Sequence, residues 1–272
     1  FYFEENGYST LPSSGELDAD GGGQVAWAWK AGGAPADGKM MKDGEEFDVP
    51  TTGSITPSKM SVNTKAGFSI VKYNATSSIE TVPHGLNKKP ELMIFKTLDS
   101  NNSWAVITYM NNEDKLEYMY LNATDGINDC NWGSLPTEEL MSVYQYNSPV
   151  IAYCWHSVPG YSAFGSYTGN GSPDGPFVYC GFRPAFVMIK RINSTAGGWW
   201  MYDNARGPTN VIPRMLIANS SSDELEDNSS YLMDFLSNGF KWRSGLAASN
   251  GSGGSFIFMA FAEQPLKTAT AR

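Results

Sequence analysis

Short runs in which apolar and polar residues alternate, separated by glycine, proline, asparagine and serine, follow one another along the whole chain. In residues 23–30, for example, one valine and two tryptophans alternate with alanine and glutamine. This period of two is expected of a β-strand that buries one face. Helical periodicity is scarce, and its two short candidates, 137–141 and 222–227, fit turns equally well. The pattern predicts an all-β protein.

The runs fall into two series that have the same order. In the first series we expect strands at 67–73, 90–97, 103–109, 116–121, 139–146 and 150–156. In the second we expect them at 177–180, 185–191, 199–202, 215–217, 231–235, 239–242 and 254–263. Residues 37–61 are polar and are predicted to form a loop, which either bridges two modules or wraps one of them.

Similar segments recur along the chain. A small residue, an aromatic residue and a second small residue or cysteine stand at 26–28, 152–154 and 260–262. Residues 90–96 resemble 184–190, and 3–8 resemble 235–240. Such recurrence is typical of duplicated domains. We therefore predict the final strands of a truncated module at 1–33 and two tandem β-sandwich modules, jelly-roll or concanavalin-like, at 34–159 and 160–272. A chain that begins inside a module is expected to be the C-terminal part of a longer protein.

Composition and charge narrow the function. The 272 residues are 41% hydrophobic and 17% charged, which argues against disorder. The net charge is −9, and lysine and arginine form no run longer than a pair, so a nucleic-acid partner is not expected. No apolar run approaches the length of a membrane span, so membrane insertion is not expected either.

The reactive side chains are few. His84 is followed by a glycine at the end of a predicted strand, and His156 shares a strand face with Cys154, but a zinc site needs four ligands and no second pair accompanies them. Cys130, Cys154 and Cys180 are odd in number and unevenly spaced, which favours structural thiols. We expect no metal and no cofactor.

The carboxylates offer no named catalytic pair. Glycosidases hold two carboxylates close together. The candidates here are Asp174, Asp203, Asp234 and Glu263, of which Asp203 is expected to form a local salt bridge with Arg206. We expect no enzymatic activity and no catalytic residues.

Aromatic side chains beside asparagine and aspartate are suited to stacking on sugar rings. Trp27, Trp104 and Trp199 lie in predicted strands and are expected to pack in a core. Trp132 and Trp200 have no aromatic counterpart in the other copies. The predicted ligand surface therefore comprises Asn128, Asp129, Trp132, Trp200 and Asp203.

Four segments resemble a known family. They are 67–73, 84–86, the long run 164–184 and 234–241. Together they are similar to an uncharacterised repeat domain of tailed phages of marine bacteria, cyanophages especially, which occurs in tail-fibre-like and other virion structural proteins. The resemblance implies a virion appendage. This family has no agreed catalytic or binding residues, so the resemblance assigns none here.

These observations favour a non-enzymatic virion structural or adhesion protein, formed by the C-terminal modules of a tail fibre or spike that contacts host-surface polysaccharide. The expected location is the virion, and the expected partners are two further copies in a homotrimer or other virion proteins. Two alternatives stay open: a carbohydrate-binding module of a secreted or surface protein, and a glycan depolymerase.

Overall fold

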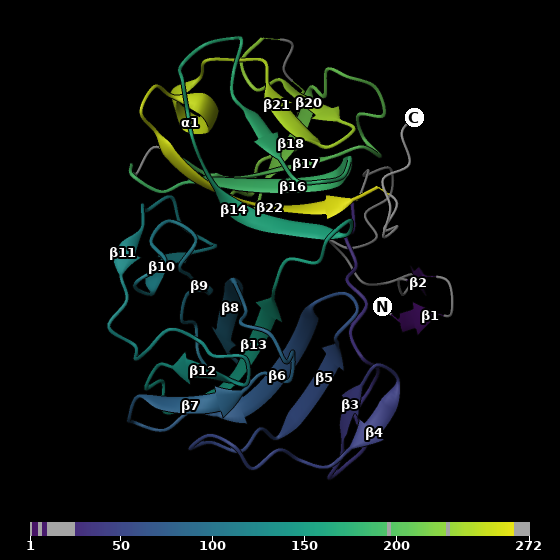
Figure 1. Ribbon diagram of the computed structural model, residues 1–272, viewed down its shortest axis with the longest axis vertical. Helices are drawn as coiled ribbons and strands as arrows, with labels where there is room; N and C mark the ends of the chain where they lie inside the picture. The colour runs from purple at the N-terminus through teal and green to yellow at the C-terminus, as the bar shows by residue number, and fades with distance from the viewer. Residues whose placement is uncertain (1, 5–6, 10–24, 195–196, 227–228, 264–272) are drawn as a thin grey trace.

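The computed structural model describes residues 2–4, 7–9, 25–194, 197–226 and 229–263. The regular secondary structure of the described chain is almost entirely β-strand, with the single four-residue helix α1 at Ala247–Asn250 (Figure 1). The all-β prediction is confirmed. The strands form two large sheets and several small ones, and three hydrophobic clusters lie between them.

The first large sheet has nine strands in the order β11-β10-β9-β8-β13-β6-β5-β3-β4. All its pairings are antiparallel except that of β3 with β5. The strands are β3 (Met40–Lys42), β4 (Glu45–Phe47), β5 (Lys59–Asn63), β6 (Phe68–Asn74), β8 (Leu92–Thr97), β9 (Ala105–Thr108), β10 (Glu117–Tyr120), β11 (Asn128–Asp129) and β13 (Pro149–Trp155).

A small sheet covers one face of this large sheet. It pairs β7 (Glu80–Pro83) with β12 (Leu140–Val143). Val82 and Met141 on the small sheet and Val71 and Phe95 on the large one are buried in the same cluster. Alternate residues of each strand therefore fill a core between two sheets, as the period of two requires.

The second large sheet has six strands in the order β14-β22-β16-β17-β18-β19 and is likewise covered on one face, by β15-β21-β20. Trp242 and Phe240 on the small sheet share a core with Val187 and Tyr202 on the large one. The strands are β14 (Ser162–Thr168), β15 (Phe177–Tyr179), β16 (Pro184–Arg191), β17 (Trp199–Asp203), β18 (Arg214–Ile217), β19 (Leu225–Glu226), β20 (Met233–Leu236), β21 (Gly239–Trp242) and β22 (Ser255–Ala262).

The remaining faces of the two large sheets pack against each other. A third cluster joins Phe68, Leu92 and Trp155 of the first sheet to Phe186 and Phe261 of the second. In Figure 1 strands β14, β16 and β22 run across the view, whereas β6, β8 and β13 run steeply beneath them. The two sheets therefore cross where this shared cluster lies. The predicted boundary at 159/160 stays a prediction, since the strands on either side of it share this core.

Several local predictions are wrong. Residues 37–61 contain β3, β4 and the start of β5, because short, polar edge strands lack the apolar alternation that marks a buried one. The two helical candidates, 137–141 and the described part of 222–227, are not helical; β12 begins at Leu140 in the first, and β19 lies at Leu225–Glu226 in the second. Residues 25–30 form no strand, and Trp27 and Trp29 pack against the cluster between the large sheets.

The N-terminal hairpin pairs β1 (Tyr2–Glu4) with β2 (Gly7–Ser9). The other predictions for the truncated module, including the start of the run at 23–30, lie outside the described residues. Within the described part of the chain no helix is long and apolar enough to cross a membrane.

Candidate functional site

Three of the five predicted ligand residues lie together at the edge of the first large sheet. Asn128 and Asp129 form β11 and are exposed, and Asp129 forms an ion pair of 2.5 Å with Lys115. Tyr118 connects them to Trp132, because it is the register partner of Asn128 and its ring stacks on the indole at 5.1 Å.

The indole of Trp132 is nevertheless occupied by neighbouring rings. Besides Tyr118, its ring centroid lies 4.6 Å from that of Tyr144 and 6.3 Å from that of Tyr146. Stacked and edge-on rings at these distances stabilise one another. The aromatic group extends the core of the first half, and its tryptophan presents little free ring face to a sugar.

Trp200 and Asp203 are buried in the second half, so their predicted place on a ligand surface is wrong. Trp200 is 6% exposed and stacks on Tyr231 at 4.7 Å. Asp203 is 4% exposed and forms the predicted salt bridge with Arg206, at 2.7 Å. Both residues lie in β17, a strand whose two faces each pack against another sheet.

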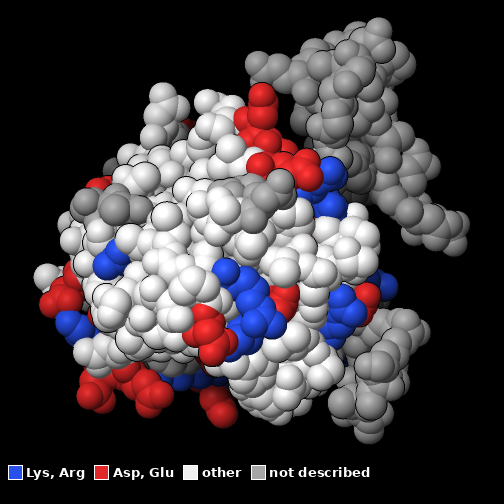
Figure 2. Space-filling view, turned by 90° about the horizontal axis from the view of Figure 1, so that it is seen from above, with Lys and Arg blue, Asp and Glu red and all other residues white. Residues whose placement is uncertain are grey.

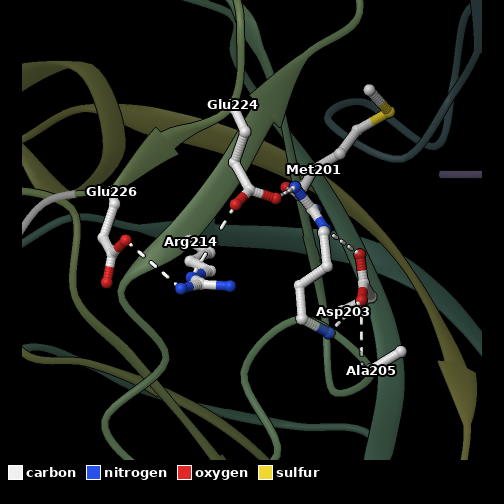
Figure 3. A network of polar contacts seen from close by, with 7 residues as sticks. Met201, Asp203, Ala205, Arg214, Glu224 and Glu226 are labelled. Atoms are coloured by element: carbon white, nitrogen blue, oxygen red, sulfur yellow. Dashed lines mark hydrogen bonds and ion pairs between the residues drawn. The ribbon is translucent and has the colours of Figure 1, made fainter. Parts of the chain in front are cut away.

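Asp203 belongs to a chain of ion pairs shown in Figure 3. Its carboxylate accepts hydrogen bonds from the backbone N–H groups of Ala205 and Arg206 as well as from the guanidinium. Arg206 also bonds Glu224 at 2.8 Å, and Arg214 continues the chain to Glu224 and Glu226. Every carboxylate of this network is neutralised by an arginine, so the network fixes loops and leaves no free acid or base.

Elsewhere on the surface of this half, positive and negative side chains also lie close to one another. Figure 2, a view from above, shows lysine, arginine, aspartate and glutamate in small mixed groups on a mostly uncharged face. No large patch of one sign covers the visible, described part of that face.

A groove of about 1440 Å³ lies beside the first large sheet and has a different charge pattern. Four lysines line it: Lys30, Lys59, Lys65 and Lys72. They come from the segment before β3, from β5, from the β5–β6 turn and from β6. Its apolar lining includes Ile70, Ile151, Ala66, Val158 and Tyr161.

One wall of the groove is the segment 30–33, which hydrogen bonds hold against β5. The Asn63 amide donates to the Lys30 carbonyl at 3.0 Å, and the Ser61 hydroxyl donates to the Gly33 carbonyl at 2.6 Å. Glycine is needed at position 32, since a Cβ there would lie 2.1 Å from the Val62 carbonyl oxygen. The wall that carries Lys30 is thus a fixed part of the fold.

The groove lysines belong to a row that crosses the first sheet. Lys59 pairs with Lys72 across β5 and β6, and Ile151 on β13 pairs with both Lys72 and Lys96. Ala105 on β9 pairs with Phe95 on β8, so the preceding residue, Trp104, lies opposite Lys96 and ends the row. Trp104 is 37% exposed, so its predicted place in a core is wrong. Lys59 and Lys72 are exposed as well, so this row of side chains is open to solvent at both of its ends.

The sequence alone could not reveal this groove, because its lysines come from segments that only the fold brings together. Lys72 lies in a predicted strand and Lys59 in a predicted loop, and nothing in either segment shows that they become neighbours. The one available signal was Lys72 itself, a charged residue on the face of β6 that also carries Phe68 and Ile70.

A family model described as a domain of unknown function, DUF7483, matches residues 1–265. The chain belongs to this family. No curated protein and no solved structure matches the chain. The family match thus spans both large sheets, and it assigns no ligand.

The two histidines of this DUF7483 chain are buried and hydrogen-bonded to backbone. His84 Nε2 lies 3.2 Å from the Thr137 carbonyl, and its Nδ1 accepts from the Leu86 N–H. Burial lowers the pKa of His84 to about 4, and burial also lowers the pKa of His156. Burial raises the pKa of Cys154 to about 12. Among the described residues no group of three or more histidine, cysteine, aspartate or glutamate side chains could hold a metal ion.

Because His84 is buried with a lowered pKa, we expect the free energy of unfolding to decrease in acid. An unfolded chain binds a proton at His84 below the ordinary histidine pKa of 6.5, whereas the folded chain does so only near pH 4. The contribution of His84 to the free energy of unfolding is therefore constant above about pH 6.5. It falls by up to about 3 kcal/mol as the pH drops from 6.5 to about 4. Urea unfolding at pH 7.5 and at pH 5 should show a loss that His84→Gln reduces by about 2 kcal/mol. An equal loss in both proteins would contradict this assignment.

Proposed function

We propose that the chain is a non-enzymatic structural and adhesion protein of a virion fibre or spike, and that it contacts host-surface glycans. The observation that carries the glycan contact is the groove beside the first large sheet, with its apolar floor and four lysines. Ligand sites combine apolar walls with a few polar groups that fix the ligand. The virion location rests on the resemblance of residues 164–184 and the other matching segments to tail-fibre-like proteins.

A tandem pair of β-sandwich modules is the architecture we propose. The strand orders support it, because β6-β13-β8-β9-β10-β11 of the first sheet corresponds to β14-β22-β16-β17-β18-β19 of the second. The registers agree as well. Lys96 faces Ile151 as Lys190 faces Ile257. Modules of one kind in series are usual in proteins whose role is extension and attachment.

The surroundings of the carboxylates support a role without catalysis. Asp203 and Asp234 are buried and paired with Arg206 and Arg243. The two others are also paired, Asp174 with Lys241 and Glu263 with Arg183. A glycosidase needs one carboxyl group that holds a proton and a second one opposite it. Each of these four carboxylates is instead held in an ion pair with a lysine or an arginine.

A glycan array probed with the purified chain tests the proposal. We expect binding to polysaccharides from the surface of the host, with no release of reducing ends. Absence of binding to any such glycan would contradict the adhesion role, and release of reducing ends would favour the depolymerase.

Light scattering tests the fibre. We expect a trimer, since fibres of this kind bury apolar faces between copies. A monomer that still binds glycans would favour the remaining alternative, a carbohydrate-binding module of a secreted or surface protein.

A further inference from the structure

The row on the first sheet that contains Lys96 has a counterpart on the second sheet that contains Lys190. The two rows differ in which residues cover them. On the second sheet Trp199 and Ile257 are the register partners of Lys190, and all three residues are at most 2% exposed. The Lys190 ammonium donates to the carbonyls of Thr124, at 2.8 Å, and Gly197, at 2.6 Å. Thr124 belongs to the first half, so a loop of the first half covers this row.

No loop of the second half covers the corresponding row of the first within the described residues. Trp104 is 37% exposed, and Lys72 and Lys59 are exposed. Lys96 donates to the carbonyls of Thr97 and Ser100 in its own hairpin, at 2.8 Å each. Lys96 therefore bonds carbonyls of its own half, whereas Lys190 bonds one of the other half, and the next positions of the first row, Ile151, Lys72 and Lys59, line an open groove.

The charges in the groove are incompletely paired. Among the described residues, Lys30, Lys65 and Lys72 have no ion-pair partner, and Lys59 has only a 3.4 Å contact with the exposed Asp37. Asp43, the one acidic residue of the lining, accepts from both the N–H and the hydroxyl of Thr64. Ammonium groups held close together repel one another, and an anionic ligand would relieve that repulsion.

The lining selects among anionic polymers. Aliphatic side chains such as Ile70, Ile151 and Val158 suit the C–H faces of sugar rings. Nucleic acid would require aromatic platforms for successive bases, and among the lining residues only Tyr161 is aromatic. Lysine is a point charge on a flexible stem and contacts carboxylate or sulfate groups without a fixed fork geometry.

We propose that this groove binds a segment of an anionic polysaccharide that carries carboxylate or sulfate groups, with Lys30, Lys59, Lys65 and Lys72 contacting the charges. The proposal rests on the proposed function and names the class of glycan. Lys96 and Trp104 continue the row beyond the residues that line the groove.

Titration calorimetry with dextran sulfate and with neutral dextran tests this assignment. We expect dextran sulfate to bind, to weaken as sodium chloride is raised, and to bind about tenfold more weakly to Lys65→Gln/Lys72→Gln. The matched control, Lys88→Gln/Lys115→Gln, removes the same charge outside the groove lining and should leave the affinity unchanged. Neutral dextran should bind to none of these proteins.

Two results would overturn the assignment. One is an equal affinity of the groove variant and the unmodified chain for dextran sulfate; the other is single-stranded DNA binding as tightly as dextran sulfate. If the groove variant kept all the binding seen on the glycan array, the assignment would fail and the adhesion role would stand. An unmodified chain that bound no glycan on the array would contradict the adhesion role itself.

Discussion

Replacement of Trp199 by alanine is expected to lower the free energy of unfolding by about 3–5 kcal/mol. Trp199 is 2% exposed and lies in the cluster between the two large sheets. Its indole N–H donates to the Tyr120 carbonyl of the first half at 2.9 Å. The substitution would remove the largest side chain on the second sheet's side of this interface and one of the two hydrogen bonds to that carbonyl, the other of which comes from the Ala123 N–H. Urea unfolding followed by circular dichroism measures the loss.

Trp104 is the matched control for this substitution. It holds the same place opposite Lys96 that Trp199 holds opposite Lys190, but it is 37% exposed. Trp104→Ala should cost about 1–2 kcal/mol, since much of the ring is in water in the folded chain. Trp199→Phe, which keeps most of the apolar volume, should cost about 1–2 kcal/mol for the lost hydrogen bond. Equal losses for the two alanine variants would contradict the unequal burial of the two rows.

A shared core also predicts how the chain unfolds. Phe68 and Trp155 of the first half and Phe186 and Phe261 of the second belong to one cluster, so neither half keeps its buried surface alone. Separate modules joined by a linker would unfold in two steps. We expect a single urea transition, seen equally by near- and far-ultraviolet circular dichroism.

Much of the strand content follows from the sequence. The predicted runs at 67–73, 90–97, 150–156, 185–191 and 254–263 correspond to the central strands β6, β8, β13, β16 and β22. Each of these strands buries at least one face almost completely, and β-branched and aromatic residues mark them clearly. The short strands β3, β4 and β19, of which β4 and β19 lie at sheet edges, were missed because they bury little and carry charged side chains.

The candidate site could not be found in the same way. Trp104 and Trp199 occupy equivalent positions and resemble each other in sequence, yet one is exposed and the other buried. The difference arises from how the two large sheets cross, which depends on the side chains of both faces together. Trp200 is likewise buried by a packing that its own strand does not reveal. The small sheet β15-β21-β20 covers the face of β17 on which Trp200 lies.

The second large effect is expected at Arg206, whose replacement by alanine should destabilise the fold by about 3–5 kcal/mol. The Arg206 side chain is 9% exposed and bonds Asp203, whose side chain is 5% exposed, at 2.7 Å. It also bonds Glu224 at 2.8 Å, and its guanidinium lies 5.7 Å from the centre of the Trp27 ring. Without it the Asp203 carboxylate stays buried with only two backbone N–H donors, which is the costly outcome for half of a buried ion pair.

Two further variants separate this charge effect from lost packing. Arg214→Ala removes an arginine of the same network that is 41% exposed, and it should cost less than about 1 kcal/mol. Asp203→Asn/Arg206→Met removes both buried charges and keeps similar volumes. If the unpaired carboxylate is the main cost, this double variant recovers about 2 kcal/mol or more of the loss seen in Arg206→Ala. A double variant as unstable as Arg206→Ala would show instead that the guanidinium stabilises the fold through its contacts with Glu224, Met201 and Trp27, because those are the contacts that both variants lack.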